Sequence, residues 1–134
     1  MVIDTSAIFA ASAGEPDSSV YRNAILSAPL RLISAVTLLE TRIVLLLRSG
    51  SSSSPVLHDL IECAGITVVP FDASMAEAAF DAFKRYGKGQ GHRAQLNIID
   101  CTAYALAKAR GLPLLFKGSD FAATDIRPAL PLQP

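Results

Sequence analysis

Short apolar segments of β-strand character alternate along this chain with longer segments of helical periodicity, and this alternation constrains the fold more than any other feature. Strands are predicted at 1–4, 31–34, 66–69 and 112–116, with a short last strand at 124–126. Helices are predicted at 5–13, 16–28, 35–49, 54–64, 73–86 and 97–110. Strands that alternate with helices form a parallel sheet whose two faces are covered by helices. We therefore predict an α/β fold, with three α/β/α layers around a central parallel sheet of four to five short strands.

Length and composition narrow the class of protein. The chain has 134 residues, and we expect a single domain over 1–134. Its hydrophobic content of 51% excludes a disordered protein, and the absence of an uncharged apolar run of ~18 residues excludes a membrane span. Cys63 and Cys101 lack metal-type spacing, which favours reduced thiols and a cytoplasmic location. A net charge of zero argues against coating nucleic acid by bulk charge.

Two details of the pattern are specific enough to be checked against a structure. The glycine- and serine-rich segment at 50–54 is predicted to be a connector within the domain. In the helix predicted at 73–86, the side chains expected to face inward are those of Met75, Ala76, Ala79, Phe80 and Phe83.

Acidic side chains fall where ligands bind in parallel α/β sheets, beyond the carboxyl ends of the strands. Asp4 ends the first strand, Asp120 follows the strand at 112–116, and Asp100 lies in the first turn of the helix after Asn97. Each has a structural explanation: Asp4 as a helix cap, Asp100 as part of a capping box with Asn97, and Asp120 as an ordinary turn residue.

Glu40 is harder to explain structurally. Its neighbours three and four positions away are Val36, Thr37, Ile43 and Val44, so it lies on an apolar face of the helix at 35–49. A carboxylate there is costly unless it is paired in a buried ion pair or bound to a metal.

Four carboxylates at one end of a sheet cannot all remain ionised unless cations neutralise them. The ion that suits oxygen ligands is Mg²⁺ or Mn²⁺, because the sequence offers no cluster of His or Cys ligands. Such ions activate water and stabilise a phosphoryl transition state, so the acids predict phosphodiester hydrolysis.

Several stretches, taken in order, carry a family likeness. They are Met1–Ile8, Gly14–Pro16, Ser34–Glu40, Tyr86–Gly89, Leu96–Ala107 and Leu114–Ile126. With these stretches the chain resembles the PIN-domain ribonucleases, and specifically the VapC-type toxins of bacterial toxin–antitoxin pairs.

The resemblance implies a PIN-like fold and an Mg²⁺- or Mn²⁺-dependent endoribonuclease. The residues it makes catalytic and metal-binding are Asp4, Glu40, Asp100 and Asp120. The residues expected to support these acids are Thr5, Ser6 and Asn97. It also implies an RNA substrate, a homodimer, and a small cognate antitoxin of the VapB type whose tail occupies the active-site groove.

Basic residues near the predicted site are candidate RNA contacts. Lys88 and Arg93 lie in the loop at 87–93, whose backbone amides could also bind phosphate, and Lys117 precedes Asp120. The loop is not a phosphate-binding P-loop, and a mobile surface loop is the alternative.

One position departs from the family pattern. The residue before Asp100 is usually glycine in the family, and here it is Ile99. This departure leaves open a second reading, in which a catalytically impaired PIN-fold module holds RNA or an antitoxin without turnover.

Overall fold

The computed structural model describes residues 1–12, 14–50 and 54–132, and most of the predicted connector at 50–54 lies outside these residues. The strands are β1 (Val2–Ile3), β2 (Leu32–Ser34), β3 (Thr67–Val69) and β4 (Leu114–Leu115). The helices are α1 (Thr5–Ser12), α2 (Ser18–Ser27), α3 (Ala35–Ser49), α4 (Ser54–Cys63), α5 (Ala73–Tyr86) and α6 (Ile98–Arg110). The bounds of α3 and α5 agree with the sequence prediction.

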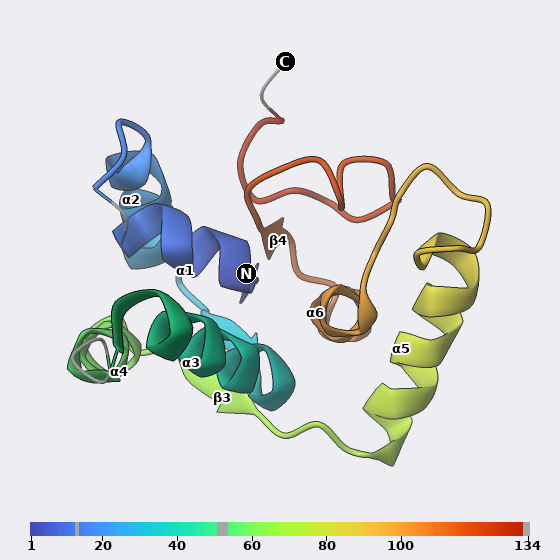
Figure 1. Cartoon of the computed structure of the whole chain (residues 1–134), viewed down its shortest axis with the longest axis horizontal. Helices are drawn as coiled ribbons and strands as arrows, with labels where there is room; N and C mark the ends of the chain where they lie inside the picture. Colours follow the sequence, from blue (N-terminus) through green and yellow to red (C-terminus); the bar gives the residue numbers. More distant parts are fainter. Residues whose placement is uncertain (13, 51–53, 133–134) are drawn as a thin grey trace.

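The four strands form one sheet in the order β3-β2-β1-β4, and every adjacent pair is parallel (Figure 1). Successive side chains of a strand point to opposite faces of the sheet. One face therefore receives Val2, Leu32 and Leu114, and the other receives Ile3, Ile33 and Leu115. All six are buried, so both faces of this short sheet need a helical cover.

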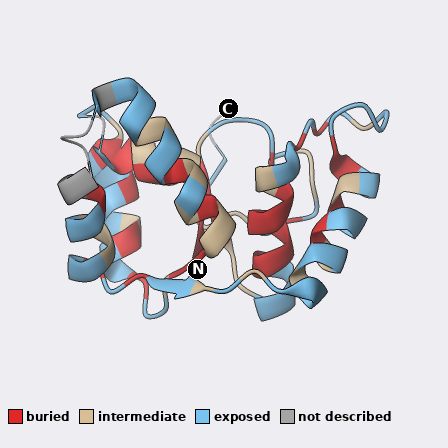
Figure 2. Ribbon diagram, turned by 60° about the horizontal axis from the view of Figure 1, so that its bottom comes forward, coloured by how far each residue is buried: buried red, intermediate tan, exposed pale blue. Residues whose placement is uncertain are grey.

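Helices supply a layer on each side of the sheet. The cluster around Ile3 and Ile33 contains side chains of α1, α2 and α4, with Leu38 and Leu45 of α3 packed against it. The cluster around Val2 contains side chains of α5 and α6. Figure 2 shows that the buried faces of these helices turn toward the middle of the molecule. The predicted three-layer α/β/α arrangement is confirmed.

The predicted last strand at 124–126 is wrong. This segment contains bends and no strand. In the described chain, the nearest strand-like pairing that follows it is an isolated bridge between Leu114 and Pro128. The reason is local, because the Thr124 amide donates to the Phe121 carbonyl oxygen at 3.0 Å and so closes a turn. Ile126 is buried, as a strand residue would be, although it belongs to no strand.

The inward face of α5 also differs from the prediction at two positions. Ala76 and Phe80 are exposed, with 58% of Phe80 accessible, whereas Ala79 is buried and Met75 and Phe83 pack against the core. The Lys84 ammonium nitrogen lies 5.0 Å from the centre of the Phe80 ring, so this ring packs against a solvated cation.

Two phenylalanines on α5 should therefore differ in their effect on stability. We expect Phe83→Ala to lower the free energy of unfolding by about 2–3 kcal/mol, because it removes a ring that packs against the core. Phe80→Ala should change it by less than about 0.5 kcal/mol. Urea denaturation of both variants measures the difference, and equal losses would contradict the orientation of α5.

In the described part of the chain, no helix combines the length and the apolar character needed to cross a membrane.

Candidate active site

The sheet brings the four acids of interest to the carboxyl ends of its strands. Asp4 follows β1 directly, and Asp120 lies in the loop after β4. Ser34 is both the last residue of β2 and the N-cap of α3, so Glu40 lies only two turns beyond the sheet. Asp100 is the third residue of α6, and the negative charges of Asp4, Asp120 and Glu40 all raise its pKa. Asp100 therefore lies close enough to each of the other three acids to be influenced by its charge.

Asp4 is the most enclosed of the four, with 4% of the residue exposed. Its Oδ2 accepts hydrogen bonds from the Ser6 amide at 2.9 Å and from the Ser6 hydroxyl at 2.5 Å. Its Oδ1 is buried and has no hydrogen-bond partner among the described residues. Burial, and to a smaller extent the charge of Glu40, raise the pKa of Asp4, although the hydrogen bonds from Ser6 oppose this.

Ser6 joins two of the site's segments. While its hydroxyl donates to Asp4, its Oγ accepts a hydrogen bond from the Lys117 amide at 3.0 Å. The end of β1 is therefore tied to the loop that leads from β4 to Asp120. Ser6 thus contacts one of the candidate acids directly, and its role in supporting a metal stays a prediction.

Glu40 is held by hydroxyl groups and not by a cation. The Thr5 hydroxyl donates to Oε2 of Glu40 at 2.6 Å, and no ion pair of Glu40 occurs among the described residues. The Thr5 and Thr41 hydroxyl oxygens are 3.1 Å apart, and the Thr41 hydroxyl donates to the Thr37 carbonyl oxygen at 2.8 Å. The buried ion pair considered from sequence is therefore absent from the described chain, and Thr5 supports the glutamate.

Sequence reasoning overlooked Thr41, whose hydroxyl lies beside that of Thr5, and gave no role to Thr37, whose backbone carbonyl oxygen accepts from Thr41. Both are fully buried, although threonine is polar and they lie on a helix that also packs apolar side chains. Their spacing of one helical turn, on either side of Glu40, is the signal that could have found them.

Asp100 takes part in the capping box predicted from sequence. Its amide donates to Oδ1 of Asn97, and its own Oδ2 accepts from the Asn97 amide, each at 2.8 Å. Burial and the neighbouring acids nevertheless raise the pKa of Asp100 to about 7, burial having the larger effect. Asp100 can therefore be both a helix-capping residue and a candidate site residue. Its carboxylate caps the N-terminus of α6 and also lies near the other acids.

Asp120 and the candidate RNA-binding residues are more exposed. Asp120 lies on the surface of its loop, as do Lys88 and Arg93 on theirs. The Lys117 ammonium lies 2.6 Å from a Glu15 carboxylate oxygen and 2.8 Å from one of Asp17, so acids compete with phosphate for this cation. The RNA contacts stay predictions.

In the described residues, no three Asp, Glu, His or Cys side chains are gathered tightly enough to enclose a metal ion as they stand. Most of the carboxylates are instead bonded to close neighbours: Asp4 to Ser6, Glu40 to Thr5, and Asp100 to Asn97. The donor set is nevertheless made of hard oxygens, and the buried, unbonded Oδ1 of Asp4 is an oxygen that a cation would satisfy. The residues fit Mg²⁺ or Mn²⁺.

The raised pKa of Asp100 has a consequence for stability without metal. The folded chain holds this proton up to about pH 7, whereas the unfolded chain releases it near the ordinary 3.8. The folded state binds more protons between these values, so its free energy of unfolding falls as the pH rises through this range. Asp4, whose pKa is also raised, acts in the same direction.

The expected result is a melting temperature in EDTA that declines from about pH 5 to about pH 8, with a smaller decline for Asp100→Asn. Scanning calorimetry across this range measures it. Asp125 does not interfere, because its pKa is lowered to about 2 and its effect is confined to more acidic solutions. An equal decline in the native chain and in Asp100→Asn would contradict the assignment.

Comparison with known proteins identifies the class to which this fold and site belong. The sequence profile of the PIN domain matches residues 1–127. The chain therefore belongs to the PIN-domain family, and the resemblance seen in its sequence is confirmed.

Within the family the chain is similar to curated VapC ribonucleases. A ribonuclease VapC of Mycolicibacterium smegmatis is 46% identical over 126 residues, which cover 94% of this chain and 97% of that protein. Ribonuclease VapC30 of Mycobacterium tuberculosis is 45% identical over 126 residues, covering 94% and 95%. Ribonuclease VapC42 of the same species is 41% identical over 129 residues, covering 96% and 98%.

Solved structures agree on the fold. The crystal structure of M. tuberculosis VapC20, described as a sarcin–ricin loop cleaving toxin, superposes with a TM-score of 0.75 at 20% identity, covering 93% of this chain and 95% of that one. A toxin–antitoxin complex from Klebsiella pneumoniae gives a TM-score of 0.67 at 17% identity, covering 92% of each chain. The predicted PIN-like fold is thus confirmed.

Proposed function

We propose that this chain is a metal-dependent endoribonuclease that hydrolyses RNA phosphodiester bonds, and that it acts as the toxin of a toxin–antitoxin pair. The observation that carries the proposal is the convergence of Asp4, Glu40, Asp100 and Asp120, with one buried carboxylate oxygen of Asp4 unbonded. The identity to ribonucleases over almost the whole chain supports the same reaction.

Asp4 and Asp100 would hold the Mg²⁺ or Mn²⁺, with Glu40 and Asp120 beside them. When bound, the ion supplies an activated water and stabilises the charge of the phosphoryl transition state. Ser6 fixes the orientation of Asp4 through two hydrogen bonds, and Thr5 fixes that of Glu40. Asp100 must lose its proton before its carboxylate can act as a ligand. Because its pKa is about 7, the free energy needed for this deprotonation is small near neutral pH.

The alternative, a binding module without turnover, rests on Ile99. This residue is half-buried, and Asp100 beside it still makes both hydrogen bonds of its capping box with Asn97. Isoleucine at this position is therefore compatible with an intact capping box at Asp100. We favour the enzyme.

Protein partners belong to the proposal. The outer face of α3 exposes the large apolar side chains of Leu39, Ile43, Leu46 and Leu47. A row of exposed apolar side chains at helical spacing favours contact with another protein chain. We infer a small antitoxin and a second copy of this chain as the partners, acting in the cytoplasm, and the toxin–antitoxin complex among the structural neighbours supports the former.

The purified chain should be incubated with RNA and Mn²⁺, and the products mapped by their new 5′ ends. Internal cleavage at defined positions is the expected result, whereas RNA that is bound but stays intact would favour the alternative. Expression without a partner should arrest growth, and a small reading frame beside the gene should relieve the arrest. Harmless expression of a soluble, RNA-cleaving chain would contradict the toxin role.

A further inference from the structure

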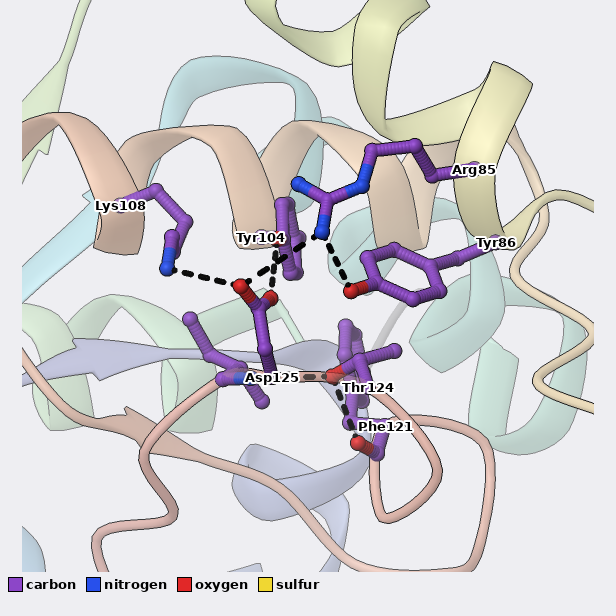
Figure 3. Close-up of polar contacts among 8 residues, drawn as sticks. Arg85, Tyr86, Tyr104, Lys108, Phe121, Thr124 and Asp125 are labelled. Carbon is purple, nitrogen blue, oxygen red and sulfur yellow. Dashed lines mark hydrogen bonds and ion pairs between the residues drawn. The ribbon is translucent and has the colours of Figure 1, made fainter.

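A polar cluster outside the acidic site joins the loop after β4 to two helices (Figure 3). The Tyr104 hydroxyl of α6 donates to Oδ1 of Asp125 at 2.5 Å. The Lys108 ammonium lies 3.2 Å from Oδ2 of Asp125, and the Arg85 guanidinium of α5 lies 3.7 Å from the same oxygen. Tyr104 is buried, while the two cations and Asp125 are exposed to a substantial degree. Asp125 is therefore the point at which this loop is fastened to the helical layer.

The loop is braced internally between Asp120 and Asp125. The Thr124 hydroxyl donates to the Phe121 carbonyl oxygen at 2.7 Å, and the Ile126 amide donates to the Thr124 hydroxyl oxygen at 3.2 Å. The side chains of Phe121 and Ile126 are buried in the core cluster beneath. The segment from Phe121 to Ile126 is therefore fixed by its buried side chains, by these hydrogen bonds and by the anchor at Asp125, and Asp120 directly precedes it.

The anchor and the active site share one helix. Asp100 and Tyr104 lie one turn apart on α6, and the capping box with Asn97 fixes the start of that helix. The Asp125–Tyr104 hydrogen bond thus ties the loop that carries Asp120 to the helix that carries Asp100.

We propose that Asp125 is a positioning residue, which acts through Tyr104 to hold Asp120 beside Asp100 and so sets the affinity of the acidic site for a divalent cation. This inference rests on the proposed function, because it takes the four acids to be the metal site. In this proposal Asp125 acts by geometry, through the hydrogen bond that it accepts from Tyr104.

The hydrogen bond from Tyr104 has the chemistry of a durable anchor. It is charge-assisted because the acceptor is a carboxylate, and it is the largest cause that lowers the pKa of Asp125 to about 2. The ion pairs with Lys108 and Arg85 are exposed, and pairs of that kind contribute little. The hydroxyl of Tyr104 is therefore the partner on which the positioning depends.

The test measures Mn²⁺ binding to the protein alone, by electron paramagnetic resonance of the free ion. We expect Asp125→Ala and Tyr104→Phe each to raise the Kd for Mn²⁺ about tenfold, the size seen when supporting groups around metal ligands are removed. Asp125→Asn should recover most of the affinity, because its amide oxygen can still accept from Tyr104. The matched control is Asp81→Asn, which removes an exposed ion pair of α5 with Lys84 and should leave the Kd unchanged.

A double-mutant comparison separates positioning from general stability. In an Asp120→Asn background, Asp125→Ala should change the Kd less than twofold, because there is no longer an Asp120 carboxylate to position. A tenfold loss in both backgrounds would overturn the inference, and so would a lower melting temperature with an unchanged Kd. Failure of Asp125→Asn to recover affinity would overturn the role of Tyr104.

The inference and the proposed function fail in different ways. A native chain that binds Mn²⁺ but leaves RNA uncut would refute the nuclease, while the binding series would still support the role of Asp125. A native chain that cleaves RNA, with variants of Asp125 and Tyr104 that bind Mn²⁺ as the native chain does, would refute only the positioning role.

Discussion

Replacing Asp4 with asparagine is expected to lower the rate of RNA cleavage on the order of 10³-fold while the chain stays folded, a loss comparable to that of a central electrostatic group in other active sites. Asp4 is the most buried of the four acids, and its Oδ1 is the oxygen that lacks a partner in the described chain. Asparagine can still accept the two hydrogen bonds from Ser6 through its amide oxygen, so the local structure should survive. Single-turnover cleavage of a labelled RNA measures the loss.

The matched control for this variant is Asp59→Asn, since Asp59 is an exposed acid of α4. It should cleave RNA at the native rate. The melting temperature of Asp4→Asn in EDTA should be no lower than that of the native chain, because the substitution removes a buried charge whose pKa is raised. An Asp4→Asn variant that cleaves RNA as fast as the native chain would show that the site has been assigned to the wrong residues.

Removing the divalent metal should lower the rate of RNA cleavage about as much as Asp4→Asn does. The four side chains are oxygen donors that carry like charge, and none of them is a histidine. Without a cation, they repel one another and the phosphate of the substrate alike. Incubation with excess EDTA is expected to lower the rate at least 10³-fold, because both water activation and phosphate stabilisation are lost.

Addition of Mg²⁺ or Mn²⁺ beyond the EDTA present should restore the native rate, which separates loss of metal from any effect of the chelator itself. Circular dichroism with and without EDTA checks that the fold is retained. Cleavage that persists at the native rate in excess chelator would contradict a metal-dependent reaction.

The periodicity of the sequence was sufficient for most of the fold. Helices such as α3 and α5 have clear caps and long apolar faces, and their bounds follow from the pattern. The strand predicted at 124–126 was wrong because Ile126 is buried without strand pairing, and the hydrogen bonds of Thr124 close a turn. The inward orientation predicted for Phe80 was wrong because apolar spacing alone does not show which apolar side chains of a helix face the core. On α5 the core contacts are made by Ala79, Ala82 and Phe83.

The candidate acids could be selected from the sequence because Asp4 and Asp120 follow strands, Asp100 lies at the start of a helix, and Glu40 lies among apolar positions of α3. Strand ends meet at one edge of a parallel sheet, so these acids were expected to lie near one another. The hydrogen bonds that hold these acids in place could not be predicted in the same way. That Thr5 would bond Glu40 and that the Lys117 amide would bond Ser6 are contacts between segments 35 and 111 positions apart in sequence. Local spacing carries no information on pairs so distant. The anchoring of Asp125 by Tyr104 belongs to the same class of contact.

Crystals of the native chain soaked in Mn²⁺ and measured for anomalous scattering test the central claim most directly. We predict a peak within about 2.5 Å of carboxylate oxygens of both Asp4 and Asp100, the range of metal–oxygen bonds in proteins. A peak held by other side chains, with none beside Asp4 and Asp100, would contradict the account.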